Sequence, residues 1–137
     1  DKNNFASLDK VSKNISNKKR VLIVDDDYTE LTYLSKEFKR NSFEVVTTMY
    51  GKDCIDKVVN NEEYDYIIID DEMANYNAVK TISEIEKKID VTKLNVIVLL
   101  GKDKESIKDH YLEDYPFTDY LLKDNYKEEI KRIKDSH

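Results

Sequence analysis

Short apolar runs alternate along this chain with stretches that repeat apolar residues at helical spacing, and this alternation limits its fold more than any other feature. The apolar runs occupy residues 21–24, 43–48, 66–70, 96–100 and 119–122. Three of them are continuously apolar, which is typical of central parallel strands buried on both faces. Because a helical stretch follows each run, the sequence predicts five βα units and an α/β fold with a doubly wound parallel sheet.

The helical stretches are recognised by apolar residues three or four positions apart, which form one buried face of a helix. They are Leu31, Leu34 and Phe38; Ile55, Val58 and Val59; Val79, Ile82, Ile85 and Ile89; Ile107, Tyr111 and Leu112; and Tyr126, Ile130 and Ile133. We therefore expect one helix after each strand.

The globular domain is expected to span residues 20–137, because residues 1–19 are polar and rich in Lys, Asn and Ser. That first segment is predicted to be a linker or an N-terminal extension. The single cysteine, Cys54, rules out a disulfide scaffold within the chain. No apolar run has the length of a membrane-spanning helix, so we expect a cytoplasmic domain without direct membrane contact.

Charge is distributed unevenly between the two parts of the chain. Residues 1–20 hold six Lys or Arg and two Asp, a net charge of +4, so the remainder carries −10 of the total of −6. An acidic body of this kind repels nucleic-acid phosphates, which disfavours nucleic-acid binding as the main activity. Acidic clefts favour cations instead.

Charged residues lie where the predicted strands end. Asp25 and Asp26 end the first strand, Asp70 ends the third and Lys123 ends the fifth. Open α/β sheets place their ligand crevice at the carboxyl ends of the strands. In the flavodoxin-like order 2-1-3-4-5 the first and third strands are neighbours, so these acids are expected to converge.

Converging carboxylates remain ionised only if a cation or an ammonium group compensates their charge. Oxygen ligands favour a hard ion, and Mg²⁺ fits because it takes few carboxylates and keeps several waters. Lys123 would supply positive charge on the other side of the site. This set suits phosphoryl transfer to an aspartate, although one strand-end Asp alone is more often a helix cap or turn residue.

The chain resembles a response-regulator receiver domain of two-component signalling over residues 20–134. RVLIVDDDYTEL resembles the family's first strand and acidic pair, DYIIIDDEM its third strand, and FTDYLLK its fifth strand. The resemblance implies that Asp70 accepts a phosphoryl group from a histidine kinase or a phosphotransfer protein. It also implies that Mg²⁺ binds Asp25, Asp26, Asp70 and the backbone carbonyl of Glu72.

The resemblance assigns further roles near the phosphoacceptor. Lys123 stands at the family's invariant lysine and Tyr120 at its switch aromatic. Gly101 is small where the family needs access to the aspartate, and Glu72 and Lys102 are expected to flank this entrance and to be able to pair across it. Catalysis, if any, would be limited to self-phosphorylation from a phosphodonor and autodephosphorylation.

Four positions depart from the family pattern. Leu100 replaces the Thr or Ser at the end of the fourth strand, so no hydroxyl is available there to bind phosphoryl oxygens. The family's Pro after Met73 is Ala74 and its Gly four residues later is Ala78. Its Lys-Pro pair is Lys123–Asp124, for which we expect a trans peptide bond. The chemistry of Asp70 looks intact, whereas the machinery that reads it looks altered.

Two other interpretations stay open from the sequence. A degenerate receiver would act as an interaction module without a phosphorylation switch, which the changes at Leu100, Ala74 and Asp124 favour. The string Asp25-x-Asp27-x-Thr29 also fits haloacid-dehalogenase-type phosphatases, although their lysine precedes the later acidic pair and Lys123 follows Asp70. We expect a part of a larger protein, such as a hybrid histidine kinase, or a stand-alone regulator, with a homodimer possible.

Overall fold

The computed structural model describes residues 18–60, 62–101 and 119–136. Five parallel strands form one sheet in the order β2-β1-β3-β4-β5. The strands are β1 (Arg20–Val24), β2 (Glu44–Thr48), β3 (Tyr66–Asp70), β4 (Val96–Leu100) and β5 (Asp119–Leu122). This order confirms the predicted flavodoxin-like sheet, and the strand limits differ from the predicted ones by one residue at most.

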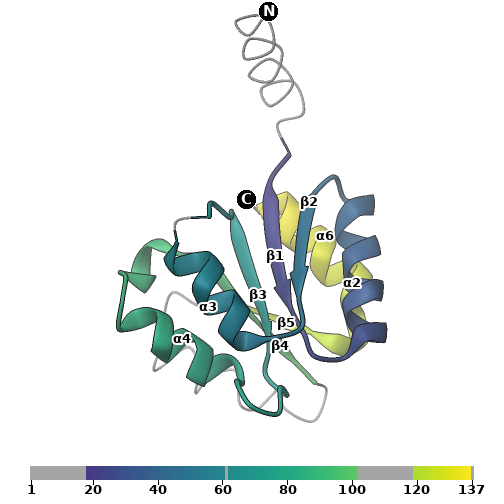
Figure 1. Ribbon diagram of the computed structural model, residues 1–137. Coiled ribbons are helices and arrows are strands. Elements are labelled where there is room, and N and C mark those ends of the chain that lie inside the picture. Colours follow the sequence, from purple (N-terminus) through teal and green to yellow (C-terminus); the bar gives the residue numbers. More distant parts are fainter. Residues whose placement is uncertain (1–17, 61, 102–118, 137) are drawn as a thin grey trace, which may run out of the picture.

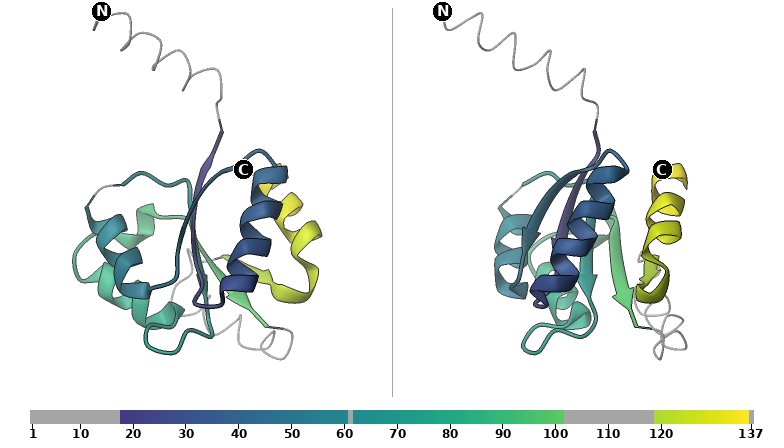
Figure 2. Two further views of the ribbon diagram at one scale, coloured as in Figure 1. Left: turned by 45° about the vertical axis from the view of Figure 1, so that its right-hand side comes forward. Right: turned by 90° about the vertical axis from the view of Figure 1, so that its right-hand side faces the viewer.

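Helices cover both faces of the sheet (Figures 1 and 2). In the described residues these are α2 (Tyr28–Arg40), α3 (Gly51–Val59), α4 (Ala78–Glu86) and α6 (Tyr126–Ser136), with short 3-10 turns η1 (Val91–Lys93) and η3 (Lys123–Asn125). Helices α2 and α6 lie on one face, and α3 and α4 lie on the other. The helix predicted around Ile107, Tyr111 and Leu112 falls outside the described residues.

Two apolar layers fill the space between the sheet and its helices. One layer joins Leu34, Phe38 and Ile130 to alternate residues of the central strands such as Ile23 and Ile68. The other layer joins helices α3 and α4 to the intervening residues of the same strands, whose side chains point to the opposite face of the sheet. Strands β3 and β4 are buried at every position, as their continuous apolar sequences predict.

One residue that the sequence places on the buried face of its helix, Val79, is exposed in the structure. It follows Ala78 directly in α4, whose buried stripe is formed by Ala78, Thr81, Ile82 and Ile85. A stripe that begins at Ala78 and continues at Ile82 and Ile85 turns Val79 outward.

Candidate phosphorylation site

Asp25 and Asp70 are brought together by the pairing of β1 with β3. Val24 pairs in register with Ile69, so the residues that follow each of them lie side by side. Asp25 is fully buried, and its Oδ1 accepts a hydrogen bond from the Asp27 backbone N–H at 3.0 Å. Asp70 is also buried, and its Oδ1 accepts one from Glu72 N–H at 2.8 Å. Both carboxylates are thus fixed by the turns that follow their strands.

A third carboxylate, Glu30, joins this pair from the first turn of α2. One oxygen from each of Asp25, Glu30 and Asp70 lies within 4.8 Å of the others. Glu30 is not among the site residues predicted from the sequence, and the pattern Asp27-x-x-Glu30 is also typical of a helix capping box. An acid one turn after a strand-end acid was the available signal. We call Asp25, Glu30 and Asp70 the acidic cluster.

Asp26, which the sequence analysis grouped with Asp25 and Asp70, lies outside this cluster in the structure. It is exposed, and its Oδ2 accepts a hydrogen bond from the Ala74 backbone N–H at 3.2 Å. Neighbouring residues at the end of an extended segment point in opposite directions, so Asp26 turns away as Asp25 turns inward. A proline at position 74 would have no N–H to donate, so the departure at Ala74 supplies this contact.

Lys123 provides positive charge at the cluster. Its Nζ lies 2.9 Å from Asp70 Oδ1 and 2.9 Å from Oδ2. It also lies 3.1 Å from Glu30 Oε1 and 3.7 Å from Glu72 Oε2. The residue follows β5 directly and begins η3. No peptide bond in the described ranges is cis, which confirms the expected trans Lys123–Asp124 bond.

The electrostatics follow from burying several carboxylates around one ammonium group. Burial raises the pKa of Asp25 to about 9, and Glu30 and Asp70 add to this rise. Burial also acts to raise the pKa of Glu30, but Asp25, Asp70 and Lys123 together bring it below its usual range. Burial opposes charge on Lys123, whereas Asp70 and Glu30 raise its pKa. The cluster therefore lacks positive charge and favours an added cation.

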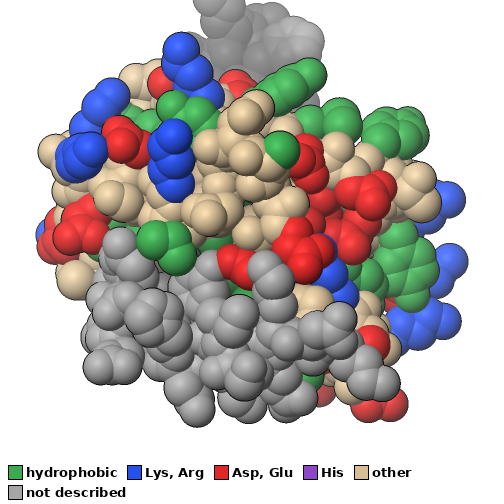
Figure 3. Space-filling view, turned by 90° about the horizontal axis from the view of Figure 1, so that it is seen from below, with side chains coloured by type: hydrophobic (Ala, Val, Ile, Leu, Met, Phe, Trp, Pro, Cys, Tyr) green, Lys and Arg blue, Asp and Glu red, His purple; other side chains and the backbone are tan. Residues whose placement is uncertain are grey.

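The donor set fits the Mg²⁺ expected from the sequence. Asp25 Oδ2 is buried and has no hydrogen-bond partner. An unpaired buried carboxylate oxygen is costly unless a cation or donor reaches it. The oxygens of the cluster are hard ligands of the kind Mg²⁺ prefers. In Figure 3, which looks onto this edge of the sheet, Asp and Glu side chains gather on one part of the surface.

The predicted entrance residues are placed only in part. A side chain added at Gly101 would come within 3.7 Å of Glu72 Oε1, which is ordinary van der Waals contact, so Gly101 lies beside Glu72. Glu72 faces Lys123 at 3.7 Å. Lys102, its expected partner, lies outside the described residues.

The two predicted switch residues share one apolar layer. Leu100 is fully buried at the end of β4, and Tyr120 packs partly buried against the same cluster of side chains. Tyr120 pairs in register with Val98, two residues before Leu100, so both side chains lie on the face covered by α3 and α4. Leu100 therefore fills space on the side of the sheet where Tyr120 packs.

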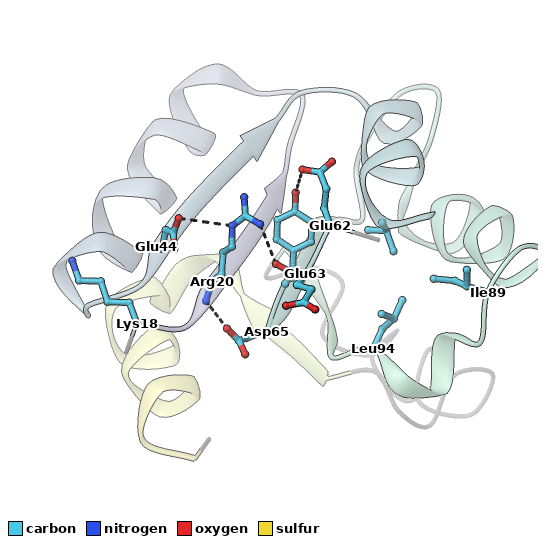
Figure 4. A pocket seen from close by; sticks show the side chains of 10 residues that line it. Lys18, Arg20, Glu44, Glu62, Glu63, Asp65, Ile89 and Leu94 are labelled. Carbon is cyan, nitrogen blue, oxygen red and sulfur yellow. Dashed lines mark hydrogen bonds and ion pairs between the residues drawn. The ribbon is translucent and has the colours of Figure 1, made fainter. Parts of the chain in front are cut away.

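A cavity of about 970 Å³ lies at the opposite edge of the sheet, where the strands begin (Figure 4). Two of its charged side chains pair with protein groups: Arg20 Nη1 donates to the Glu63 carbonyl at 3.2 Å, and Asp65 Oδ2 accepts from the Arg20 backbone N–H at 2.6 Å. A smaller hollow of about 380 Å³ adjoins the acidic edge and includes Asp26, Met73 and Tyr76. Cavity size alone would point to the wrong edge, because the acidic cluster lies at the carboxyl edge.

Comparisons with known proteins identify the family of this chain. The sequence matches the response regulator receiver domain family over residues 21–134. It is 29% identical over 115 residues to the two-component response regulator ARR11 of Arabidopsis thaliana, covering 83% of this chain and 21% of the relative. It is 27% identical over 89 residues to protein PilH of Pseudomonas aeruginosa, covering 65% of this chain and 73% of PilH. The chain thus spans about a fifth of the plant regulator's length.

Solved structures share the fold. The chemotaxis response regulator CheY4 of Vibrio cholerae superposes with a TM-score of 0.73 at 18% identity, covering 87% of this chain and 98% of that one. The receiver domain of a Pseudomonas aeruginosa sensor histidine kinase, which was solved with a magnesium ion coordinated in its active-site cleft, also has a TM-score of 0.73 at 18% identity. That match covers 87% of this chain and 96% of that receiver domain. From the sequence match across nearly the whole described domain, this chain belongs to the response regulator receiver domain family.

Proposed function

We propose that Asp70 accepts a phosphoryl group from a histidine kinase or a histidine phosphotransfer domain. The observation that supports this most is the position of Lys123, whose Nζ lies 2.9 Å from each carboxylate oxygen of Asp70. Asp70 is buried at the carboxyl end of β3, beside the other members of the acidic cluster. A carboxylate that lies between an ammonium group and acids able to bind a cation is suited to attack phosphorus.

In this reaction an Asp70 carboxylate oxygen attacks the phosphorus atom of the donor phosphohistidine. A P–O bond forms as the P–N bond breaks, and the imidazole leaves with the bonding electron pair. Lys123 hydrogen-bonds the oxygens that carry the transferred charge. The Glu72 N–H bond to Asp70 Oδ1 holds the nucleophile's orientation.

Mg²⁺ is the proposed cofactor, and when bound it neutralises charge on the transferring phosphoryl oxygens. Asp25 and Asp70 are the residues best placed to hold it, with Asp26 and the backbone carbonyl of Glu72 as the further ligands that the resemblance implies. The unpaired Asp25 Oδ2 supports this assignment. Asp26 Oδ2 accepts the Ala74 N–H, so Oδ1 is the oxygen through which Asp26 would take part directly.

The test is phosphorylation with acetyl phosphate in Mg²⁺, followed by intact-mass measurement. The attack of Asp70 on acetyl phosphate releases acetate, so the domain should gain one phosphoryl group. Asp70→Asn should gain none. Asp71→Asn is the matched control, because Asp71 is the neighbouring buried acid outside the cluster, and it should still be labelled. Labelling that persists in Asp70→Asn would refute Asp70 as the acceptor.

The wider setting is proposed on the same basis. We propose that the domain works in the cytoplasm as one part of a larger signalling protein, such as a hybrid histidine kinase, or as a stand-alone regulator. Within the described ranges, no helix has both the length and the apolar character needed to cross a bilayer. The alternative of a phosphorylation-independent interaction module is not favoured, because Asp25, Asp70 and Lys123 lie together as phosphoryl transfer requires.

A further inference from the structure

Glu30 occupies a position from which it would ordinarily cap its own helix. In a capping box the N-cap side chain accepts from the first-turn N–H groups, while the acid three residues later bonds back to the N-cap N–H. Asp27 does the first part, since its Oδ1 accepts from Thr29 N–H at 3.0 Å and Glu30 N–H at 3.2 Å. The Asp27 N–H, however, donates to Asp25 Oδ1. The Glu30 side chain is left free to turn into the site.

There it shares the Lys123 ammonium group with Asp70. The distances to Lys123 Nζ are 3.1 Å from Glu30 and 2.9 Å from Asp70. The Glu30 side chain is 20% exposed and that of Lys123 is 16% exposed, so water screens this ion pair only in part. Glu72 also faces Lys123, but at 3.7 Å and with a half-exposed side chain. Glu30 is therefore the stronger competitor of Asp70 for Lys123.

We propose that Glu30 is a positioning residue that holds Lys123 and acts in opposite directions on the two ligands of the site: it strengthens binding of the divalent cation and weakens binding of the phosphoryl group. This inference rests on the proposed function of Asp70. Glu30 adds a carboxylate within 4.8 Å of Asp25 and Asp70, which attracts a cation. The same negative charge repels a phosphoryl group on Asp70. It also attracts the Lys123 ammonium group, which the phosphoryl oxygens need.

The experiment compares the domain with Glu30→Gln, which keeps the shape of the side chain and removes its charge. Mg²⁺ affinity is measured by calorimetry. Affinity for beryllofluoride, a noncovalent stand-in for the phosphoryl group, is measured in saturating Mg²⁺ from amide chemical shifts. We expect Glu30→Gln to bind Mg²⁺ several-fold more weakly and beryllofluoride on the order of tenfold more tightly, as the loss of one nearby charge predicts.

Two control variants separate a local effect from net charge. Glu44→Gln changes the total charge equally but lies on the opposite edge of the sheet, and it should move neither affinity. Glu72→Gln should shift both affinities in the same directions as Glu30→Gln but by less, because its carboxylate is farther from Lys123 and more exposed.

The outcomes are distinguishable. A purely structural role for Glu30 would weaken both ligands together in Glu30→Gln, and this result would overturn the inference, as would two unchanged affinities. If acetyl phosphate labels Asp70 while Glu30→Gln changes nothing, the inference alone is wrong. If neither protein is labelled at Asp70 or binds beryllofluoride, the proposed function is wrong and the inference falls with it.

Discussion

The sheet has an amino edge, where its strands begin, and a carboxyl edge, where they end. Each edge holds a basic side chain among acids, but the burial of these charges differs. At the amino edge, Arg20 lies beside Glu44 and Asp65, and its guanidinium group stacks 4.9 Å from the Tyr64 ring. The side chains of Arg20 and Glu44 are 35% and 62% exposed. At the carboxyl edge, the side chains of Lys123 and Asp70 are 16% and 3% exposed.

Water can screen the exposed charges at the amino edge, but it screens the buried charges at the carboxyl edge much less. Exposed pairs contribute little to stability and need no further compensation. Buried like charges must acquire a proton, a counter-ion or a ligand. The carboxyl edge meets this second condition, because Asp25, Glu30 and Asp70 bring three carboxyl groups within 4.8 Å of one another beside one ammonium group. The carboxyl edge is therefore the one at which we propose the function, although the larger of the two cavities lies at the amino edge.

The largest expected effect comes from removing the basic residue at each edge. Lys123→Met should lower the free energy of unfolding by about 2–4 kcal/mol without Mg²⁺, because it leaves the buried Asp70 and the partly buried Glu30 uncompensated. Arg20→Met should cost about 1 kcal/mol or less, since its ion pair is exposed. Urea denaturation of both variants provides the measurement.

Added Mg²⁺ supplies the control for that pair. It should restore part of the stability lost in Lys123→Met, because it replaces positive charge at the cluster. It should leave the deficit of Arg20→Met unchanged. Equal costs for the two substitutions, or equal recovery, would remove the distinction between the edges.

A smaller effect is expected from Mg²⁺ on the unmodified domain. Binding only to the folded state stabilises it by RT ln(1 + [L]/Kd), which is about 1–3 kcal/mol at concentrations ten- to a hundredfold above Kd. Thermal melts in millimolar Mg²⁺ should therefore rise. Asp25→Asn should lose most of this rise, whereas Asp65→Asn at the amino edge should keep it. A melt that Mg²⁺ does not change would contradict the site.

The sequence was sufficient for the fold because each strand is short, apolar and followed by a helical stretch. Buried β3 and β4 are the clearest cases, since no polar residue interrupts either one before its last position. The exposed position of Val79 was missed because apolar spacing alone does not say where a helix stripe begins.

The site was predictable in its main members and not in its details. Asp70 and Lys123 meet because they end strands of one parallel sheet. The inward turn of Glu30 depends on which acceptor takes the Asp27 N–H, and the outward turn of Asp26 depends on an N–H at Ala74. Such choices between equivalent hydrogen bonds leave no periodic pattern in a sequence. They were therefore visible only in three dimensions.

The smallest expected effect is the conformational change at Tyr120 when a phosphoryl mimic binds at Asp70. In the receiver family, the hydroxyl at the end of the fourth strand moves toward the phosphoryl group and leaves space for the aromatic residue of the fifth. Leu100 has no hydroxyl, and its buried side chain occupies the layer against which Tyr120 packs. A ligand shifts a conformational equilibrium only by its differential affinity for the two states. Beryllofluoride with Mg²⁺ should thus change amide chemical shifts around Asp70 while those of Tyr120 barely move.

Two substitutions at Leu100 divide this prediction into its causes. Leu100→Thr supplies a hydrogen bond to a charged acceptor, worth roughly 1.5–3 kcal/mol, and should extend the shift changes to Tyr120. Leu100→Val has the shape of threonine without the hydroxyl, so it tests bulk alone. If Leu100→Val restores the response as fully as Leu100→Thr, steric obstruction is the whole cause. Large changes at Tyr120 in the unmodified domain would show instead that the acidic edge reaches its switch by a route that needs no hydroxyl.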